Sequence, residues 1–97
     1  MVRIMLLIRL EEDDRFCLGT VMNIATSPFV GMIIALKMGG VLYQKEVLSV
    51  ICTPDEEFPM VIVSPSSPED LKQLEDGEVW TWFHPPPFQQ ISRPAGI

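Results

Sequence analysis

Hydrophobic and polar residues alternate from the first positions of the chain. The even positions of residues 2–10 are all apolar, whereas the odd positions carry Arg3 and Arg9 at either end of Met5 and Leu7. Successive side chains of an extended strand point to opposite faces, so alternation of this kind predicts a strand with one buried face. A strand over residues 2–10 is therefore expected.

A second strand is expected to return beside the first. The acidic run 11–14 separates residues 2–10 from residues 15–24, where apolar residues again recur at every second position. A short polar run between two such segments is typical of a hairpin turn. Gly19 interrupts the second segment, and a glycine inside a strand favours a bulge.

Two further apolar runs flank a pair of glycines. Residues 30–37 and 41–52 are separated by Gly39-Gly40, and tight hairpin turns need the positive φ that glycine adopts without strain. The alternation slips in the second run, because Tyr43 and Lys45 have one parity and the later apolar residues have the other. A bulge near Lys45-Glu46 would restore the register.

The only helix signals follow a short apolar run at residues 59–63, itself a predicted strand. Ser67 is a good N-cap, Pro68 suits the first helical position, and two acidic residues follow in the first turn. Leu71 and Leu74 make a short apolar stripe, and Gly77 is a typical helix end. One short helix is therefore expected near residues 67–76.

The segment 78–83 is rich in aromatic and β-branched residues and predicts a last strand. Trp80 and Trp82 would share one face of it, and Phe83 would lie on the other. Both faces of this strand have large side chains. The aromatic residues therefore either pack in a closed core or form a recognition surface, and the sequence leaves these two alternatives open.

The last residues, 84–97, predict a proline-rich C-terminal tail. Pro85–Pro87 cannot form regular main-chain hydrogen bonds, but a stiff extended segment loses little entropy when it docks. We expect this segment and Phe88 to dock against folded protein, within the chain or across a dimer. The overall prediction is a mainly β fold: one domain over residues 1–83, a small antiparallel meander of about six strands, barrel-like or sandwich-like, with one short helix.

Charge narrows the classes of partner. The chain has 97 residues, a formal net charge of -6 and only 7 Lys and Arg residues. Because duplex nucleic acid is bound through basic residues that displace counterions, no duplex nucleic-acid partner is expected. No run of about 18 apolar residues is present, and no signal-peptide pattern begins the chain, so neither a membrane partner nor export is expected, and a cytoplasmic location is predicted.

Residues with catalytic or metal-binding chemistry are few. His84 is the only histidine, and Cys17 and Cys52 match no zinc spacing with it. We therefore expect no metal, no cofactor and no enzymatic activity. The two cysteines are interpreted as reduced thiols, with a single bridge between them left open.

One segment resembles a hairpin found in small bacterial and phage β-domains. It reads Val30-Gly31-Met32-Ile33-Ile34-Ala35-Leu36, then Gly39-Gly40 and Tyr43. Such patterns also arise in unrelated hairpins, so the resemblance implies no activity and no site.

The function predicted from these features is interaction rather than turnover. The leading hypothesis is a small acidic protein-interaction module. A homo-oligomer is expected, with a dimer favoured. A narrower version of this hypothesis is an inhibitor or adaptor, of the kind that phages and mobile elements encode, that acts on a basic partner. The alternative is a protein that binds a small molecule or a nucleotide-like ligand in an aromatic pocket at a barrel mouth or subunit interface. Trp80, Trp82 and Tyr43 would stack on this ligand, and Arg15 or Lys45 would hold an anionic group. The candidate binding residues are Tyr43, Trp80, Trp82, Phe83, His84 and Phe88.

Overall fold

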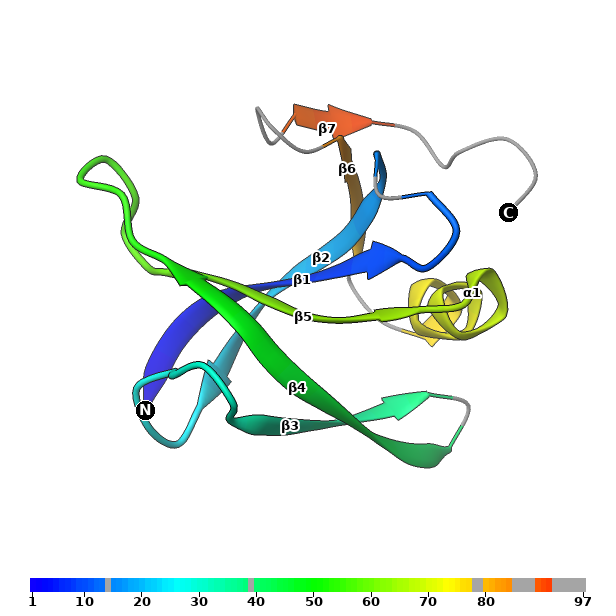
Figure 1. Ribbon diagram of the computed structural model, residues 1–97, viewed down its shortest axis with the longest axis horizontal. Helices are drawn as coiled ribbons and strands as arrows, with labels where there is room; N and C mark the ends of the chain where they lie inside the picture. Colours follow the sequence, from blue (N-terminus) through cyan, green and yellow to red (C-terminus); the bar gives the residue numbers. More distant parts are fainter. Residues whose placement is uncertain (14, 39, 78–79, 85–88, 92–97) are drawn as a thin grey trace.

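The fold is a curled sheet of seven strands with one helix, as seen in a computed structural model (Figure 1). The structure describes residues 1–13, 15–38, 40–77, 80–84 and 89–91. The elements are β1 (Val2–Leu10), β2 (Cys17–Ile24), β3 (Ile33–Met38), β4 (Val41–Ile51), β5 (Met60–Ser66), α1 (Pro68–Gly77), β6 (Thr81–His84) and β7 (Gln89–Ile91). No helix within these described ranges is both long and apolar enough to cross a membrane.

The strand order is β3-β4-β5-β1-β2-β6-β7, and all neighbouring strands are antiparallel except β1 and β5. This confirms the predicted mainly β fold with one short helix. The parallel pair is the departure from a simple meander. After the β3–β4 hairpin, the chain returns beside β1 rather than beside β2, so β1 lies in the middle of the sheet with partners on both edges.

The central position of β1 explains why both of its faces carry apolar residues. Leu6 is fully buried on one face, and its neighbour Leu7 is 2% exposed on the other. Arg3 and Arg9 remain exposed near the two ends of the strand. The alternation correctly indicated one buried face, and the middle of the second face is buried as well.

The sheet curls because β4 bends between two partners. Residues 41–46 of β4 pair with β3, and residues 47–51 pair with β5. The register between β4 and β5 shifts between Val47 and Ser49, which leaves Leu48 as the extra residue. The bulge predicted near Lys45-Glu46 therefore lies two residues later, where the strand changes partner. A bulge increases the local twist, and here it turns the β3–β4 hairpin across the rest of the sheet to make a half-barrel (Figure 1).

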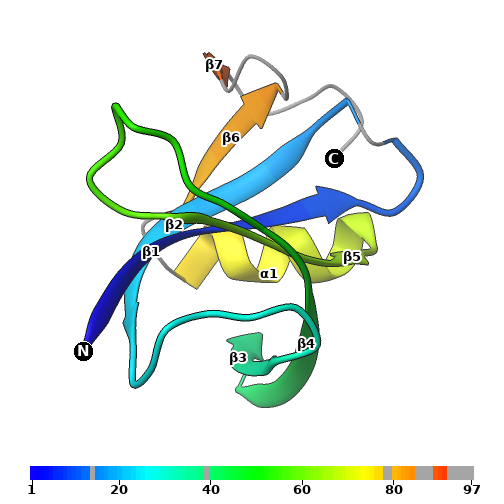
Figure 2. The same cartoon turned by 60° about the vertical axis from the view of Figure 1, so that its left-hand side comes forward.

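The hairpin between β3 and β4 and the helix form where the sequence predicted them. Met38 pairs with Val41, and Gly40 in the turn has a φ of 83°, the positive value for which glycine was expected. At the start of α1, the Asp70 amide donates to Ser67 Oγ at 3.3 Å, the N-cap bond that the sequence indicated. The helix α1 lies inside the curl of the sheet (Figure 2), and its Leu71 and Leu74 side chains are buried in the hydrophobic core.

Gly19 does not mark a bulge. It pairs with Leu7 in an unbroken register along β1 and β2. Its role is to provide space, because an added Cβ would lie 2.7 Å from Leu7 Cδ2 and 3.0 Å from Phe83 Cε2. A glycine inside a strand often marks the close approach of a neighbouring group, and that is what it does here.

Two apolar clusters lie on opposite faces of the sheet. The inner core, inside the curl, consists of Ile4, Leu6, Ile8, Leu10, Leu18, Ile34, Leu36, Val47, Val61, Val63, Leu71, Leu74 and Trp82. The outer core consists of Leu7, Cys17 and Ile62, with Met5, Ile51, Met60 and Phe83 packed around them. The inner core therefore holds most of the buried apolar side chains of the described chain.

The sheet continues beyond the start of the expected C-terminal tail. His84 is the last residue of β6, and the segment Gln89–Ile91 forms β7 beside it. Ile91 is half-buried against the inner core. The sequence did not predict β7, because a three-residue strand after a proline cluster has no alternation to detect. The segment 85–88 lies outside the described residues, so the docking expected of Phe88 and the prolines stays a prediction.

Candidate functional site

The half-barrel leaves a cleft between β2 and β3. Among the described residues, β2 pairs with β6 only over residues 17–19, and β3 pairs only with β4. The two strands therefore face each other across the open side without pairing. The cavity between them has a volume of about 250 Å³. The residues that line this β2–β3 cleft are Thr20, Val21, Met22, Ala35, Leu36, Lys37, Leu74 and Trp80.

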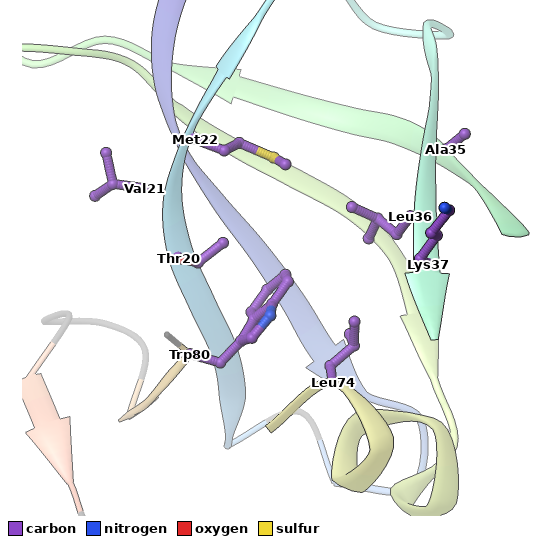
Figure 3. Close-up of a pocket in the computed structure, with 8 residues that line it drawn as sticks. All are labelled: Thr20, Val21, Met22, Ala35, Leu36, Lys37, Leu74 and Trp80. Atoms are coloured by element: carbon purple, nitrogen blue, oxygen red, sulfur yellow. The ribbon is translucent and has the colours of Figure 1, made fainter. Parts of the chain in front are cut away.

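Side chains enter the cleft from one face of each strand only. Met22, Leu36 and Leu74 point toward one another and toward the Trp80 indole, and together they make an apolar floor (Figure 3). In the same view, the side chains of Val21, Ala35 and Lys37 point away, as strand alternation requires. These three residues therefore border the cleft mainly with their main-chain atoms.

The hydrogen-bond pattern shows which main-chain groups of β3 face the cleft. Val47 of β4 donates to Met32 O and accepts from Gly31 N, both at 2.8 Å, so its amide and carbonyl point toward β3. Main-chain groups alternate sides along a strand, and the register places Lys45 opposite Ile34. The amides and carbonyls of alternate β3 residues, starting at Ile34, consequently bond to β4. Those of Ile33, Ala35 and Lys37 point to the open edge.

The same reasoning applies to β2. The Leu10 amide donates to Phe16 O at 3.1 Å, and the Met5 amide donates to Pro59 O at 3.0 Å. The even residues of β1 therefore bond to β2, and its odd residues bond toward β5. In register, the main-chain groups of Val21 and Asn23 point away from β1. Beyond residue 19, no strand of the described chain pairs with that edge.

Trp80 gives the cleft a specific polar group. Its Nε1 atom is buried and has no hydrogen-bond partner among the residues that the structure describes. A buried donor without an acceptor costs about 1–3 kcal/mol. An acceptor atom brought into the cleft beside the indole would remove that cost. This is the feature of the site that most directly indicates a bound group.

Lys45, which the sequence offered as an anchor for an anionic ligand, has a different role. Its side chain is buried, and Nζ donates to Pro65 O at 3.1 Å. Burial lowers the pKa of Lys45, and the negative charges of Asp70 and Glu11 oppose that shift. Neither Lys45 nor Arg15 lines the cleft. Arg15 instead forms a salt bridge with Asp13, in which Nη2 and Oδ2 are 2.7 Å apart.

The predicted binding residues do not gather in one place. Of the three expected to stack on a ligand, Trp82 is buried in the inner core, Tyr43 is half-buried against it, and only Trp80 lines the cleft. Phe83 packs on the outer core. The rings of the exposed His84 and of Phe16 are nearly perpendicular, and their centroids are 6.0 Å apart. Phe88 lies outside the described residues.

Sequence reasoning missed most of the cleft. Met22 and Leu36 have the parity of a buried strand face, so their apolar character was visible. Nothing in the sequence shows that β2 and β3 border the same opening, because that depends on how far β4 bends. The helical spacing of Leu71 and Leu74 did predict a shared apolar face, but it did not indicate that this face borders an opening.

The cysteines and acidic residues offer little chemistry in the described chain. Cys17 and Cys52 are free thiols, the first buried and the second exposed. Burial raises the pKa of Cys17 to about 11, which makes its thiolate scarce at neutral pH. No three His, Cys, Asp or Glu residues among those described come together as metal ligands would.

Comparison with models of protein families, with curated proteins and with solved structures finds no match to this chain.

Proposed function

We propose that this protein is a small, acidic, non-enzymatic interaction module whose β2–β3 cleft accepts an extended segment of a partner protein. The observation that carries the proposal is the main-chain edge of β3, where Ile33, Ala35 and Lys37 point their amides and carbonyls to the open side. An unpaired edge of this kind is a template for another strand.

The cleft supplies both affinity and selectivity for such a segment. Each main-chain hydrogen bond to the β3 edge contributes about 0.5–1.5 kcal/mol net. Every second side chain of the added strand would rest on the floor made by Met22, Leu36 and Leu74. A carbonyl of the segment that comes close to Trp80 Nε1 would also accept its proton. A strand with alternating apolar residues fits this arrangement best.

The experiment compares two substitutions at one exposed position. Ala35→Pro removes the amide that points to the open edge and leaves the bonds to β4 in place, because proline is tolerated where a strand amide faces outward. Ala35→Ser is the matched control, since it keeps the amide. Binders are selected from a library of random peptides about a dozen residues long, and their affinities for both variants and the parent protein are measured.

Selected peptides should alternate in polarity, lose at least about tenfold in affinity for Ala35→Pro and bind Ala35→Ser as they bind the parent. The methyl signal of Met22, recorded from protein labelled at methionine methyl groups, should shift on binding. The proposal fails if the library yields no binder, or if the binders tolerate Ala35→Pro.

The unpartnered Trp80 Nε1 favours a second candidate, a small molecule that places an acceptor atom in the same cleft. The two candidates respond oppositely to substitution. A small molecule held by the indole would lose affinity in Trp80→Phe, which keeps an aromatic ring but removes the donor, and would tolerate Ala35→Pro. A strand held by the β3 edge would lose more affinity in Ala35→Pro than in Trp80→Phe.

A further inference from the structure

The outer face of the sheet has a second cavity, separate from the cleft. Its volume is about 150 Å³, room for about one bulky side chain, and it lies between the middle of the sheet and the β4–β5 loop. The residues that line it are Met5, Leu7, Glu56, Phe58, Met60 and Phe83. This cavity is called the outer pocket below. Leu6 and Leu7 are consecutive residues of β1, so their side chains point to opposite faces of the sheet. Leu6 belongs to the inner core, which borders the β2–β3 cleft, and Leu7 lines the outer pocket. The two cavities therefore lie on opposite sides of the sheet.

The lining of the outer pocket suits an apolar anchor residue. Five of its six residues are Met, Leu or Phe, and the two methionines have unbranched, polarizable side chains that adapt to the shape of what they contact. Met5, Met60 and Phe83 are only half-buried, so part of this apolar surface is open. Bulky side chains that fill pockets of this kind supply much of the energy of protein interfaces.

Charge at the mouth of the pocket selects the residues that flank the anchor. Glu56 lines the pocket, and its neighbours Asp55 and Glu57 are also exposed, which gives three adjacent carboxylates. Arg3 brings a positive charge close to the pocket, because its guanidinium lies 6.0 Å from the centre of the ring of Phe58, a lining residue. One positive charge leaves this rim acidic, so a segment with basic residues beside its anchor is complementary to it.

We infer that the outer pocket is a second docking site, which holds an apolar side chain of a partner segment whose neighbouring residues are arginine or lysine. The apolar side chain fills the space between Met5, Met60 and Phe83. The basic residues lie over the Asp55–Glu57 turn. This site does not require a strand in the cleft, because it is formed from the opposite face of the sheet.

Methionine methyl groups report on the two sites separately. Met5 and Met60 line the outer pocket, whereas Met22 lines the cleft. The probe is a short capped peptide, Ser-Arg-Arg-Phe-Arg-Ser, added to the full chain labelled at its methionine methyl groups. Two matched peptides replace either the phenylalanine by serine or the arginines by glutamates. We expect the Met5 and Met60 signals to shift with the first peptide while the Met22 signal stays in place.

We expect binding of the peptides to depend both on the phenylalanine and on the charge of the residues beside it. The peptide without phenylalanine should leave the Met5 and Met60 signals unshifted, and the glutamate peptide should bind at least about tenfold more weakly than the arginine peptide. The double variant Glu56→Gln with Glu57→Gln should weaken the arginine peptide about two- to tenfold, since each exposed pair contributes a modest amount. Both glutamates are exposed in a loop, so these substitutions leave the core intact.

The matched control is Glu12→Gln with Glu69→Gln, which changes the net charge equally at exposed positions outside the pocket. This control should bind the arginine peptide about as the parent does. The inference is overturned if no methyl signal shifts at millimolar peptide, if Met22 shifts as much as Met5 and Met60, or if the two double variants weaken binding equally. A Met22 shift alone would place the peptide in the cleft and leave the strand-docking proposal standing.

Discussion

The inner and outer cores are made by the same strands and differ in what covers them. The inner core has α1 and the turned β3–β4 hairpin over it, and thirteen buried residues of the described chain belong to it. The outer core has three buried residues, with the β4–β5 loop and Phe83 beside them. A chain this small has little material to cover both faces of its sheet, and here the inner face is covered more completely than the outer one.

Both candidate sites follow from this difference. The cleft opens where the cover of the inner core stops short of β2, and the outer pocket opens where the loop leaves the second face partly exposed. Leu36 and Leu74 belong to the inner core and also line the cleft, and Leu7 belongs to the outer core and also lines the outer pocket. In this fold, binding surface and core are therefore continuous, so substitutions in one are expected to affect the other.

The largest expected effect comes from Leu6→Ala. Leu6 is fully buried in the inner core, and removing its side chain should lower the free energy of unfolding by about 4 kcal/mol. The matched substitution is Leu7→Ala on the same strand, which should cost about 2–3 kcal/mol, because flexible methionines around the outer pocket can move into the space. Urea unfolding of both variants measures the difference, and equal costs would show that the two cores are equally well packed.

Next in size is Gly19→Ala. The new Cβ would crowd Leu7 Cδ2 at 2.7 Å, and the Leu6 carbonyl oxygen, at 3.2 Å, cannot easily retreat. Overpacking of this kind costs about 1–3 kcal/mol. In a Leu7→Ala background the nearest obstacle is gone, so the same substitution should cost about 1 kcal/mol less. A double-mutant cycle by urea unfolding tests this coupling, and additive costs would place the strain at the Leu6 carbonyl or the Phe83 ring instead.

Local signals predicted the elements of the fold better than they predicted how the elements meet. The N-cap at Ser67, the turn glycine at Gly40 and the alternation of β1 each act over a few residues, and the structure confirms all three. The bulge in β4 depends on a change of strand partner, which alternation cannot reveal. The cleft depends on that bulge in turn, so of the five predicted binding residues that the structure describes only Trp80 lines it.

A medium effect is expected at the helix that covers the inner core. Ser67→Ala removes the acceptor of the Asp70 amide and should lower the free energy of unfolding by about 1 kcal/mol. Ser67→Asp should retain most of it, since a carboxylate caps the helix and interacts favourably with its dipole. Ser27→Ala, in the exposed β2–β3 loop, is the control and should stay near the parent value. If Ser67→Ala is equally stable, α1 is held by Leu71 and Leu74 alone.

The smallest effect is expected at the turn between β1 and β2, where polar contacts rather than either core hold the chain. Hydrogen bonds from Arg15 lower the pKa of Asp13 from 3.8 to about 2. The Arg15 guanidinium also lies 5.5 Å from the centre of the Phe16 ring. Phe16 in turn packs against the inner core. Because the folded pKa lies below the unfolded one, the carboxylate stabilises the fold above about pH 4, and this contribution is lost as the pH falls toward 2. The Arg15 side chain is exposed and Asp13 is only partly buried, so solvent screens the pair and the shift in melting temperature should be small. Thermal unfolding of the parent and of Asp13→Asn between pH 6 and pH 1 should show a difference that shrinks from about pH 4 downward and vanishes only below pH 2. A difference that stays constant over this range would mean that the asparagine alters the turn itself, and that the ion pair with Arg15 adds nothing to stability.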